Sequence, residues 1–327
     1  MLQLLDKLST PAVVFATLST LAVTKYVFAG YLRWKRSKDF VKVGTIECVY
    51  CFPIKSCSGM KVQQAECSKL GIRVHGVTDR HYLVIQPNGD FITQRQEPKM
   101  ALIKVTAIHG EIQLTADGMS SLNIPKDLSK NNQIIDCRVW NDRVKGMDCG
   151  QEASDWLHKF LGIPGLRLVH SSSDLQKRDC SKPSKPWGNP AKPGDEVAYG
   201  DFCAYLIANT ASLEDLNKRL SYPVTFSNFR PNIVVKTDVP YDEDNWSELR
   251  IGETIDMRML DGCTRCQLTT VNPDLGAKSL SGEPLKTLKA FRCFKQYGSS
   301  PIFCVNGTVD TPGPIAAGDP VYAIRKY

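Results

Sequence analysis

The sequence predicts a protein of the α+β class that is mostly β, with a barrel-like body and a few helices. Short segments rich in β-branched and aromatic residues recur along the chain, and Gly, Pro and Asn turn signals separate them. Segments with helical periodicity are few and do not alternate regularly with the strands. This pattern argues against a doubly wound parallel sheet.

The first half of the chain contains most of the expected strands. The clearest hairpin signal is Pro87-Asn88-Gly89, because Asn-Gly tolerates the positive φ angles of a tight turn. Another pair of strands surrounds His109-Gly110. The expected strands are Gly44–Phe52, His81–Ile85, Phe91–Gln94, Ala101–Ile108, Glu111–Ala116 and Ile134–Trp140.

Two helices and a long polar segment follow. The first helix carries apolar residues on one face from Ala153 to Leu161, and Gly162 is expected to end it. Residues 171–194 are polar and without periodicity, which indicates a mobile loop or a linker. A second helix is expected near Ser212, whose spacing to Asp215 resembles a capping box. Strands are expected at residues 232–236, 268–271 and 321–325.

Length and charge restrict the organisation of the chain and its partners. A chain of 327 residues can form two globular units around a large core. The formal net charge is +7, but residues 25–42 hold six basic residues and one acid, so the remainder carries only about +2. A charge of that size does not indicate a nucleic-acid surface, and no nucleic acid is expected as a partner.

The N-terminal region, residues 1–42, is predicted to be a membrane anchor with a basic flank. Residues 11–32 are apolar apart from Thr, Ser, Gly and Lys25, and as a helix they would span roughly 33 Å. Basic residues follow this stretch, which favours an uncleaved anchor with the body in the cytosol. An amphipathic presequence and a buried helix are the alternatives.

The most informative motif is Cys263-Thr264-Arg265-Cys266, directly before the apolar run from Leu268 to Val271. We expect this run to begin a strand that fixes the Cys266 side chain, and Arg265 to favour its thiolate form. A thiolate binds soft metals or attacks electrophiles. Taken alone, the motif is better explained by a buried structural cysteine.

Other candidate residues point to an anion. Lys55 and Ser56 follow an early strand, where an ammonium group, a hydroxyl and backbone N–H groups would suit a phosphate. Arg230 precedes a buried-looking strand and so needs an anionic partner, either an internal carboxylate or a bound phosphate. Taken alone, Arg80 is better explained as a salt-bridged residue at a strand edge, and Asp201 is equally a turn former or an acid near the site.

Taken together, these motifs resemble the MOSC family. The segments that carry the resemblance, from about residue 44 to residue 321, are Tyr50–Cys57, Asp79-Arg80, Thr93–Pro98, Asn228–Val234 and Cys263–Thr270. With the N-terminal anchor, the chain most closely resembles the mitochondrial amidoxime-reducing branch of that family. The resemblance implies a MOSC N-terminal β-barrel region at residues 43–170, a loop or linker at 171–194 and a MOSC domain at 195–327.

The resemblance also implies a site for a molybdenum–molybdopterin cofactor. Cys266 would be the metal ligand and, with Asp201, a catalytic residue, whereas Cys263 would be structural. Phe202 and Cys203 stand where relatives often carry hydroxyl residues. The implied cofactor-binding residues are Lys55, Ser56, Arg80, Asn228, Arg230, Thr264, Arg265 and Cys266.

The reaction implied by the resemblance is the reduction of small N-hydroxylated compounds, such as amidoximes and hydroxylamines. The chain has no flavin or haem motif of its own. The family implies electrons from NADH through cytochrome b5 reductase and cytochrome b5, at the mitochondrial outer membrane. A sulfur carrier or a cofactor sulfurase is the alternative, but no pyridoxal-phosphate domain precedes the MOSC-like region.

Overall fold

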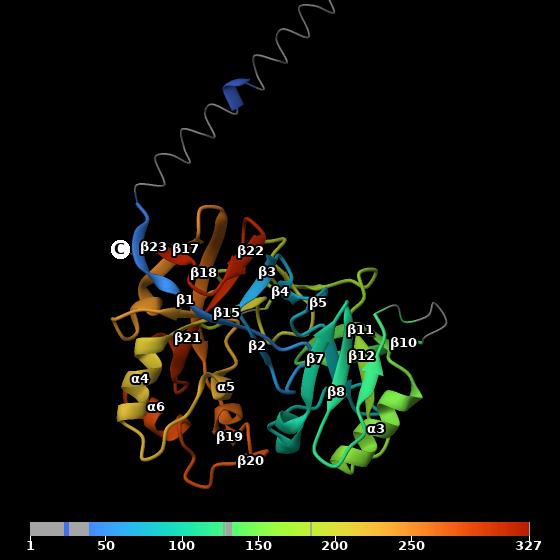
Figure 1. The fold of residues 1–327 in the computed structure, drawn as a ribbon. Coiled ribbons are helices and arrows are strands. Elements are labelled where there is room, and N and C mark those ends of the chain that lie inside the picture. Colours follow the sequence, from blue (N-terminus) through green and yellow to red (C-terminus); the bar gives the residue numbers. More distant parts are fainter. Residues whose placement is uncertain (1–22, 26–38, 127, 129–132, 184, 327) are drawn as a thin grey trace, which may run out of the picture. The chain divides into compact units, whose positions relative to one another are not determined.

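The computed structural model describes residues 23–25, 39–126, 128, 133–183 and 185–326 (Figure 1). The chain divides into two units, Met1–Val41 and Lys42–Tyr327. The anchor expected over residues 1–42 lies mainly outside the described residues. Among those that are described, no helix combines the length and the apolar character that a membrane crossing requires.

A closed barrel of 7 strands organises the second unit, which confirms the prediction of a mostly β, barrel-like body. β1 closes the barrel by pairing with β16 in antiparallel register, Val49 beside Ile233. In order around the barrel the strands are β16 (Ile233–Lys236), β15 (Tyr205–Asn209), β21 (Ile302–Val309), β18 (Ile255–Thr264), β17 (Trp246–Ile251), β23 (Pro320–Arg325) and β1 (Val41–Cys51).

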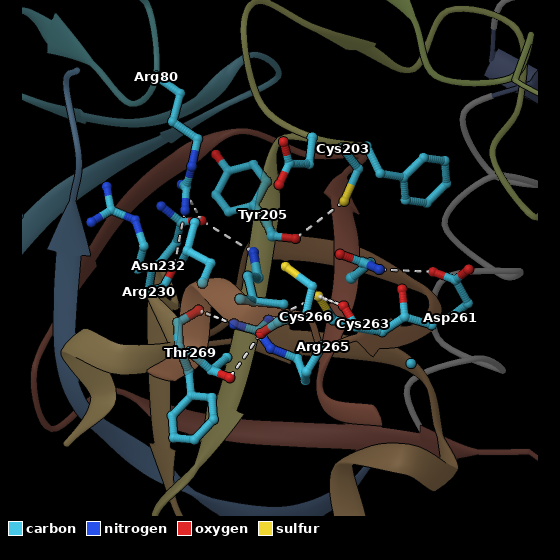
Figure 2. A pocket seen from close by; sticks show the side chains of 18 of the residues that line it. Arg80, Cys203, Tyr205, Arg230, Asn232, Asp261, Cys263, Arg265, Cys266 and Thr269 are labelled. Carbon is cyan, nitrogen blue, oxygen red and sulfur yellow. Dashed lines mark hydrogen bonds between the residues drawn. The ribbon is translucent and has the colours of Figure 1, made fainter. Parts of the chain in front are cut away.

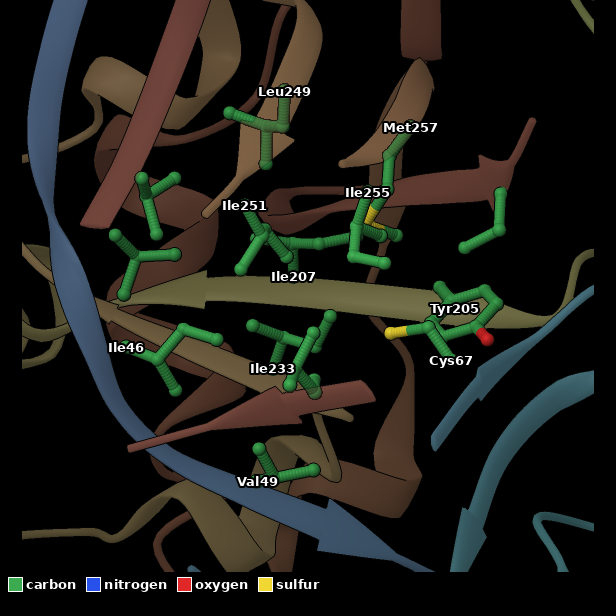
Figure 3. Packing of buried hydrophobic residues seen from close by; sticks show 14 of the residues in the cluster. Ile46, Val49, Cys67, Tyr205, Ile207, Ile233, Leu249, Ile251, Ile255 and Met257 are labelled. Atoms are coloured by element: carbon green, nitrogen blue, oxygen red, sulfur yellow. The ribbon is translucent and has the colours of Figure 1, made fainter. Parts of the chain in front are cut away.

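The interior of the barrel is filled by aliphatic side chains from all around the sheet (Figure 3). Ile46, Ile207, Ile233, Leu249 and Ile255 are buried in one cluster, each at most 2% exposed. Full burial of such a side chain contributes about 1.5–3 kcal/mol. The barrel interior is therefore a packed core.

Smaller sheets and helices accompany the barrel. β2 (Met60–Val62) extends the sheet beside β1. One further sheet contains β10 (Ile134–Val139), β11 (Asp142–Asp148), β12 (Arg167–His170) and β6 (Tyr82–Ile85). Another contains β22 (Gly313–Ala316), β3 (Gln64–Ser68), β4 (Gly71–Val74) and β5 (Val77–Thr78), and a third β7 (Lys104–Ile108), β8 (Glu111–Thr115) and β9 (Leu122–Ile124).

The remaining elements are short. Two-stranded sheets join β13 (Arg178–Asp179) to β14 (Glu196–Val197) and β19 (Val271–Asn272) to β20 (Ala277–Lys278). The α-helices are α3 (Gln151–Leu161), α4 (Thr210–Lys218), α5 (Phe226–Phe229) and α6 (Leu285–Phe291). The 3-10 helices are η1 (Pro98–Leu102), η2 (Asp242–Asn245), η3 (Gln267–Thr270) and η4 (Lys295–Tyr297).

Local signals predicted some boundaries well and others poorly. Gly162 adopts a left-handed conformation and donates its N–H to the carbonyl of His158, so it ends α3 as expected. The expected capping box at Ser212 is wrong. Asn209 caps α4 by accepting the N–H of Ala211 at 2.9 Å, and the Ser212 hydroxyl instead bonds a buried carboxylate.

Barrel closure depends on the buried side chains of β16. We expect Ile233→Ala to lower the free energy of unfolding by about 2–5 kcal/mol, because the side chain is fully buried on a strand that pairs with both β15 and β1. Urea unfolding measures the change. Ile134→Ala, on β10 and 51% exposed, is the matched control, with an expected change within about 0.5 kcal/mol. Equal midpoints for the two variants would contradict this account of barrel stability.

Candidate functional site

A pocket of about 400 Å³ lies where several barrel strands end (Figure 2). Its wall combines residues from both halves of the chain, far apart in sequence. Of the residues that the sequence singled out, eight line it: Lys55, Ser56, Arg80, Asp201, Arg230, Thr264, Arg265 and Cys266. The sequence prediction therefore selected residues that the fold does bring together.

Asn228 does not line the pocket but lies behind one of its loops. Its side-chain amide donates to the backbone carbonyls of Thr269 and Val271 at 3.2 and 3.1 Å. Its carbonyl oxygen accepts the backbone N–H of Thr225, which starts α5. These bonds indicate a role in holding the segment after Cys266, not in direct contact with a ligand.

The Cys266 thiol is exposed to the pocket, and its backbone begins a 3-10 helix, η3, where a strand was expected. The threonines explain this difference. The Thr269 hydroxyl and N–H both donate to the carbonyl of Cys266, and the Thr270 hydroxyl donates to that of Gln267. Such local bonds replace the ladder bonds of a strand.

The arginine whose guanidinium lies within hydrogen-bonding distance of the Cys266 thiol is Arg95, whereas Arg265 interacts with that thiol through its charge. Arg95 Nη1 lies 3.5 Å from Cys266 Sγ. The Arg265 guanidinium instead donates to Cys263 Sγ at 2.9 Å and to the carbonyl of Phe229 at 2.8 Å. Burial nevertheless raises the pKa of Cys263, so this thiol is expected to stay protonated.

Four residues of the pocket hold an unusual backbone conformation. Ser56, Arg80, Trp140 and Arg230 have φ angles of 71°, 51°, 57° and 61°, in the left-handed region that non-glycine residues rarely adopt. Each such residue costs on the order of 1–3 kcal/mol and persists only where the surroundings fix it. Their concentration in one pocket is typical of a functional site.

The two arginines at this side of the pocket differ in their partners. Arg80 forms an ion pair with Asp79 and donates to the Arg230 carbonyl at 3.0 Å. The Arg230 guanidinium lies 4.2 Å from the Phe52 ring, and its Nη2 atom is buried without a hydrogen-bond partner among the described residues. Burial, with the nearby charge of Arg80, lowers the pKa of Arg230 to about 9.

The charges around the pocket favour an anionic ligand. Six basic side chains line it against two carboxylates, those of Asp201 and Asp261, which leaves four positive charges. The Nε atom of Arg265, like Nη2 of Arg230, is buried without a partner within the part of the chain that the structure describes. Buried donors of this kind require an acceptor, so the pocket suits an anion with several oxygens.

Lys55 and Asp201 form an ion pair inside the pocket. Lys55 Nζ donates to Asp201 Oδ1 at 2.5 Å and to the Tyr199 carbonyl at 2.8 Å. Burial lowers the pKa of Lys55 to about 8, although Asp201 opposes that shift. Withdrawal from bulk water opposes ionisation of Asp201, but Lys55 outweighs it and keeps the pKa of this carboxyl below its ordinary value.

Several pocket residues were not selected from the sequence. Arg95 lies in the Thr93–Pro98 motif, which carried part of the family resemblance, and it could have been placed in the site on that basis. Trp140 ends an expected strand and donates its indole N–H to Asp201 at 3.0 Å. Lys185 and Trp187 come from the polar loop, whose sequence has no periodicity that could place them.

The chain is similar to known proteins over most of its length. Residues 43–164 match the MOSC N-terminal beta barrel domain, and residues 194–322 match the MOSC domain. Mitochondrial amidoxime-reducing component 1 of Mus musculus is 38% identical over 92% of this chain and 89% of its own length. The Homo sapiens protein of the same name is 38% identical over 92% of this chain and 90% of its own length.

The charge state of Lys55 predicts a pH dependence of anion binding. Because the pKa of Lys55 is lowered to about 8, its positive charge is present below that pH and is lost above it. We expect the affinity for sulfate, whose charge is constant, to fall by up to about tenfold between about pH 7 and about pH 9. Isothermal titration measures this, and Lys55→Met should reduce the dependence to the smaller part that Arg230, with a pKa of about 9, contributes. The same slope in both proteins would contradict the assignment.

Removal of the buried cation at position 230 should stabilise the ligand-free protein and weaken anion binding. In ligand-free protein we expect Arg230→Met to raise the free energy of unfolding by on the order of 1 kcal/mol, because an unpaired buried charge disappears. Sulfate binding should weaken in the same variant. Urea unfolding and titration measure the two effects. Arg73→Met, at an exposed ion pair, is the control, and a destabilised Arg230→Met would refute the argument.

Proposed function

Because the chain belongs to the MOSC-domain family, among the mitochondrial amidoxime-reducing components, we propose that it is a molybdenum-cofactor oxidoreductase that reduces N-hydroxylated compounds. One observation supports this proposal above all: an exposed thiol, Cys266, shares a pocket with buried guanidinium nitrogens that lack partners among the described residues. A thiolate suits a soft metal, and the unpaired donors suit the anionic part of a pterin cofactor.

The residues of the pocket divide naturally between two tasks. Lys55, Ser56, Arg80 and Arg230 would hold the phosphate and the polar edge of the pterin, with Thr264 and Arg265 beside them. Cys266 would be the protein ligand of molybdenum. When bound, such a cofactor supplies two-electron, oxygen-transfer chemistry that no protein side chain can provide.

Reduction of an amidoxime breaks its N–O bond and consumes two electrons and two protons, giving an amidine and water. The chain must therefore supply protons inside a pocket partly withdrawn from water. Lys55 suits this task, because its Nζ proton has a pKa of about 8. Asp201, kept ionised by Lys55, would hold the ammonium group in place.

Electrons must reach this pocket from another protein under this proposal. The sequence carries no flavin or haem motif. We propose the route from NADH through cytochrome b5 reductase and cytochrome b5, at the mitochondrial outer membrane. The names of the relatives support a mitochondrial location, and the apolar segment at residues 11–32 supports an N-terminal anchor with the body in the cytosol. Shared anchorage would raise the effective concentration of such partners.

The proposal predicts about one molybdenum per chain in purified protein, together with NADH-driven reduction of benzamidoxime when cytochrome b5 and its reductase are added. Cys266→Ser should lose both, because it removes the thiolate ligand. Cys293→Ser, at another exposed cysteine, is the matched control and should retain both. Elemental analysis and amidine formation are the measurements.

Two results would count against the proposal. Zinc in place of molybdenum would remove the cofactor assignment. Full activity without cytochrome b5 or its reductase would remove the electron route.

A further inference from the structure

One side of the pocket is formed by the polar loop that was expected to be mobile. Residues 185–190, here called the strap, lie between β13 and β14. Lys185 and Trp187 line the pocket. The backbone pairing of β13 with β14 brings together the two ends of the loop that carries the strap. Its side chains contact the barrel through a small set of bonds on β18.

The central bond of the strap is a shielded ion pair. Asp261 Oδ2 on β18 accepts from Lys185 Nζ at 2.7 Å and from the Trp187 indole N–H at 2.8 Å. Asn306 on β21 donates to the other oxygen of Asp261 at 2.9 Å (Figure 2). The side chains of Lys185 and Asp261 are 14% and 6% exposed, so neither charge is fully hydrated. An unpaired charge there would be costly.

The same contacts place aromatic surfaces on the pocket wall. Lys185 Nζ lies 3.0 Å from the centre of the Phe202 ring, and the Trp187 ring packs edge-on against Tyr297 with 4.9 Å between ring centroids. Tyr297 in turn accepts the backbone N–H of Gly262, the residue after Asp261. The strap is thus fixed both by charge and by aromatic packing.

A second aromatic surface borders the same stretch of the pocket. Trp140 bonds Asp201, and Phe202 is the next residue along the chain. The guanidinium of Arg95, which lies beside the Cys266 thiol, is 4.5 Å from the Trp140 ring. Aromatic rings therefore line the pocket that also holds the Cys266 thiol.

We propose that the strap is the substrate-selecting wall of this site. The Lys185–Asp261 ion pair is the latch that holds it, and Trp187 with Phe202 forms an apolar surface for substrates that carry a flat aromatic group. The aromatic selectivity rests on the proposed reductase function. The latch does not, because it follows from contacts within the chain.

The latch is tested by hydrogen exchange. Asp261→Asn removes the charge that keeps Lys185 in place, and Lys185 can then turn to solvent with the strap. We expect the backbone amides of Lys185, Trp187, Gly188 and Asn189 to exchange at least about fivefold faster than in the wild-type protein. Asp256→Asn, at another ion-paired aspartate of β18 that bonds Arg250, is the matched control and should leave these amides unchanged. Unchanged exchange in Asp261→Asn, or an equal increase in the control, would overturn the latch.

The selecting role is tested by comparing benzamidoxime with acetamidoxime, which has a methyl group in place of the ring. For Trp187→Ala and Asp261→Asn we expect the ratio of kcat/KM for the aromatic over the methyl substrate to fall by about tenfold, mainly through KM. Lys182→Met, at an exposed residue of the same loop, should retain the wild-type ratio. A constant ratio in all three variants would overturn the selecting role.

The two readouts separate failure of this proposal from failure of the reductase assignment. If the wild-type protein reduces neither substrate, the proposed function fails, while the exchange experiment still decides the latch. If both substrates are reduced and exchange is faster but the ratio is constant, the reductase assignment stands and the selecting role is wrong.

Discussion

The concentration of positive charge in a pocket partly withdrawn from water is the constraint on which the site depends. Two guanidinium groups, those of Arg80 and Arg230, lie close enough to affect each other, and burial together with this repulsion lowers the pKa of Arg230. Self-repulsion of this kind destabilises a folded chain, and it persists only where the scaffold is rigid. Both arginines also hold a left-handed backbone conformation, which adds a cost in folding free energy.

Barrel closure is what makes that arrangement possible. β1 and β16 run antiparallel, so the end of β1 lies beside the beginning of β16. Lys55 and Ser56 follow the first of these strands, and Arg230 precedes the second, which brings residues from opposite halves of the chain to one edge of the barrel. The long-range pairing that closes the barrel also assembles the anion-binding side of the pocket. A change that loosens β16 should therefore affect binding as well as stability.

The sequence predicted the residue types of the site better than their mutual contacts. Lys55 and Arg230 could be selected because a cation beside an apolar strand needs an anion. The contact between Arg95 and Cys266 could not, because it joins two loops whose proximity depends on tertiary structure. The secondary structure of the segment after Cys266 was also not predictable from the sequence. There the apolar, β-branched run predicted a strand, and bonds from threonine hydroxyls to nearby carbonyls produced a 3-10 helix instead.

Fold class was easier to predict, because turn signals and strand patterns are local. The contacts of the polar loop, residues 171–194, were the hardest feature to predict. Its composition indicates mobility, yet Lys185 is fixed by a buried carboxylate on a strand almost eighty positions later. No local pattern in either segment reveals that partner. Polar composition alone therefore does not distinguish a solvated loop from one that is held by a charged side chain paired inside the fold. In this protein a loop of the second kind forms a wall of the pocket, and the Lys185–Asp261 pair holds Trp187 where it would contact a substrate.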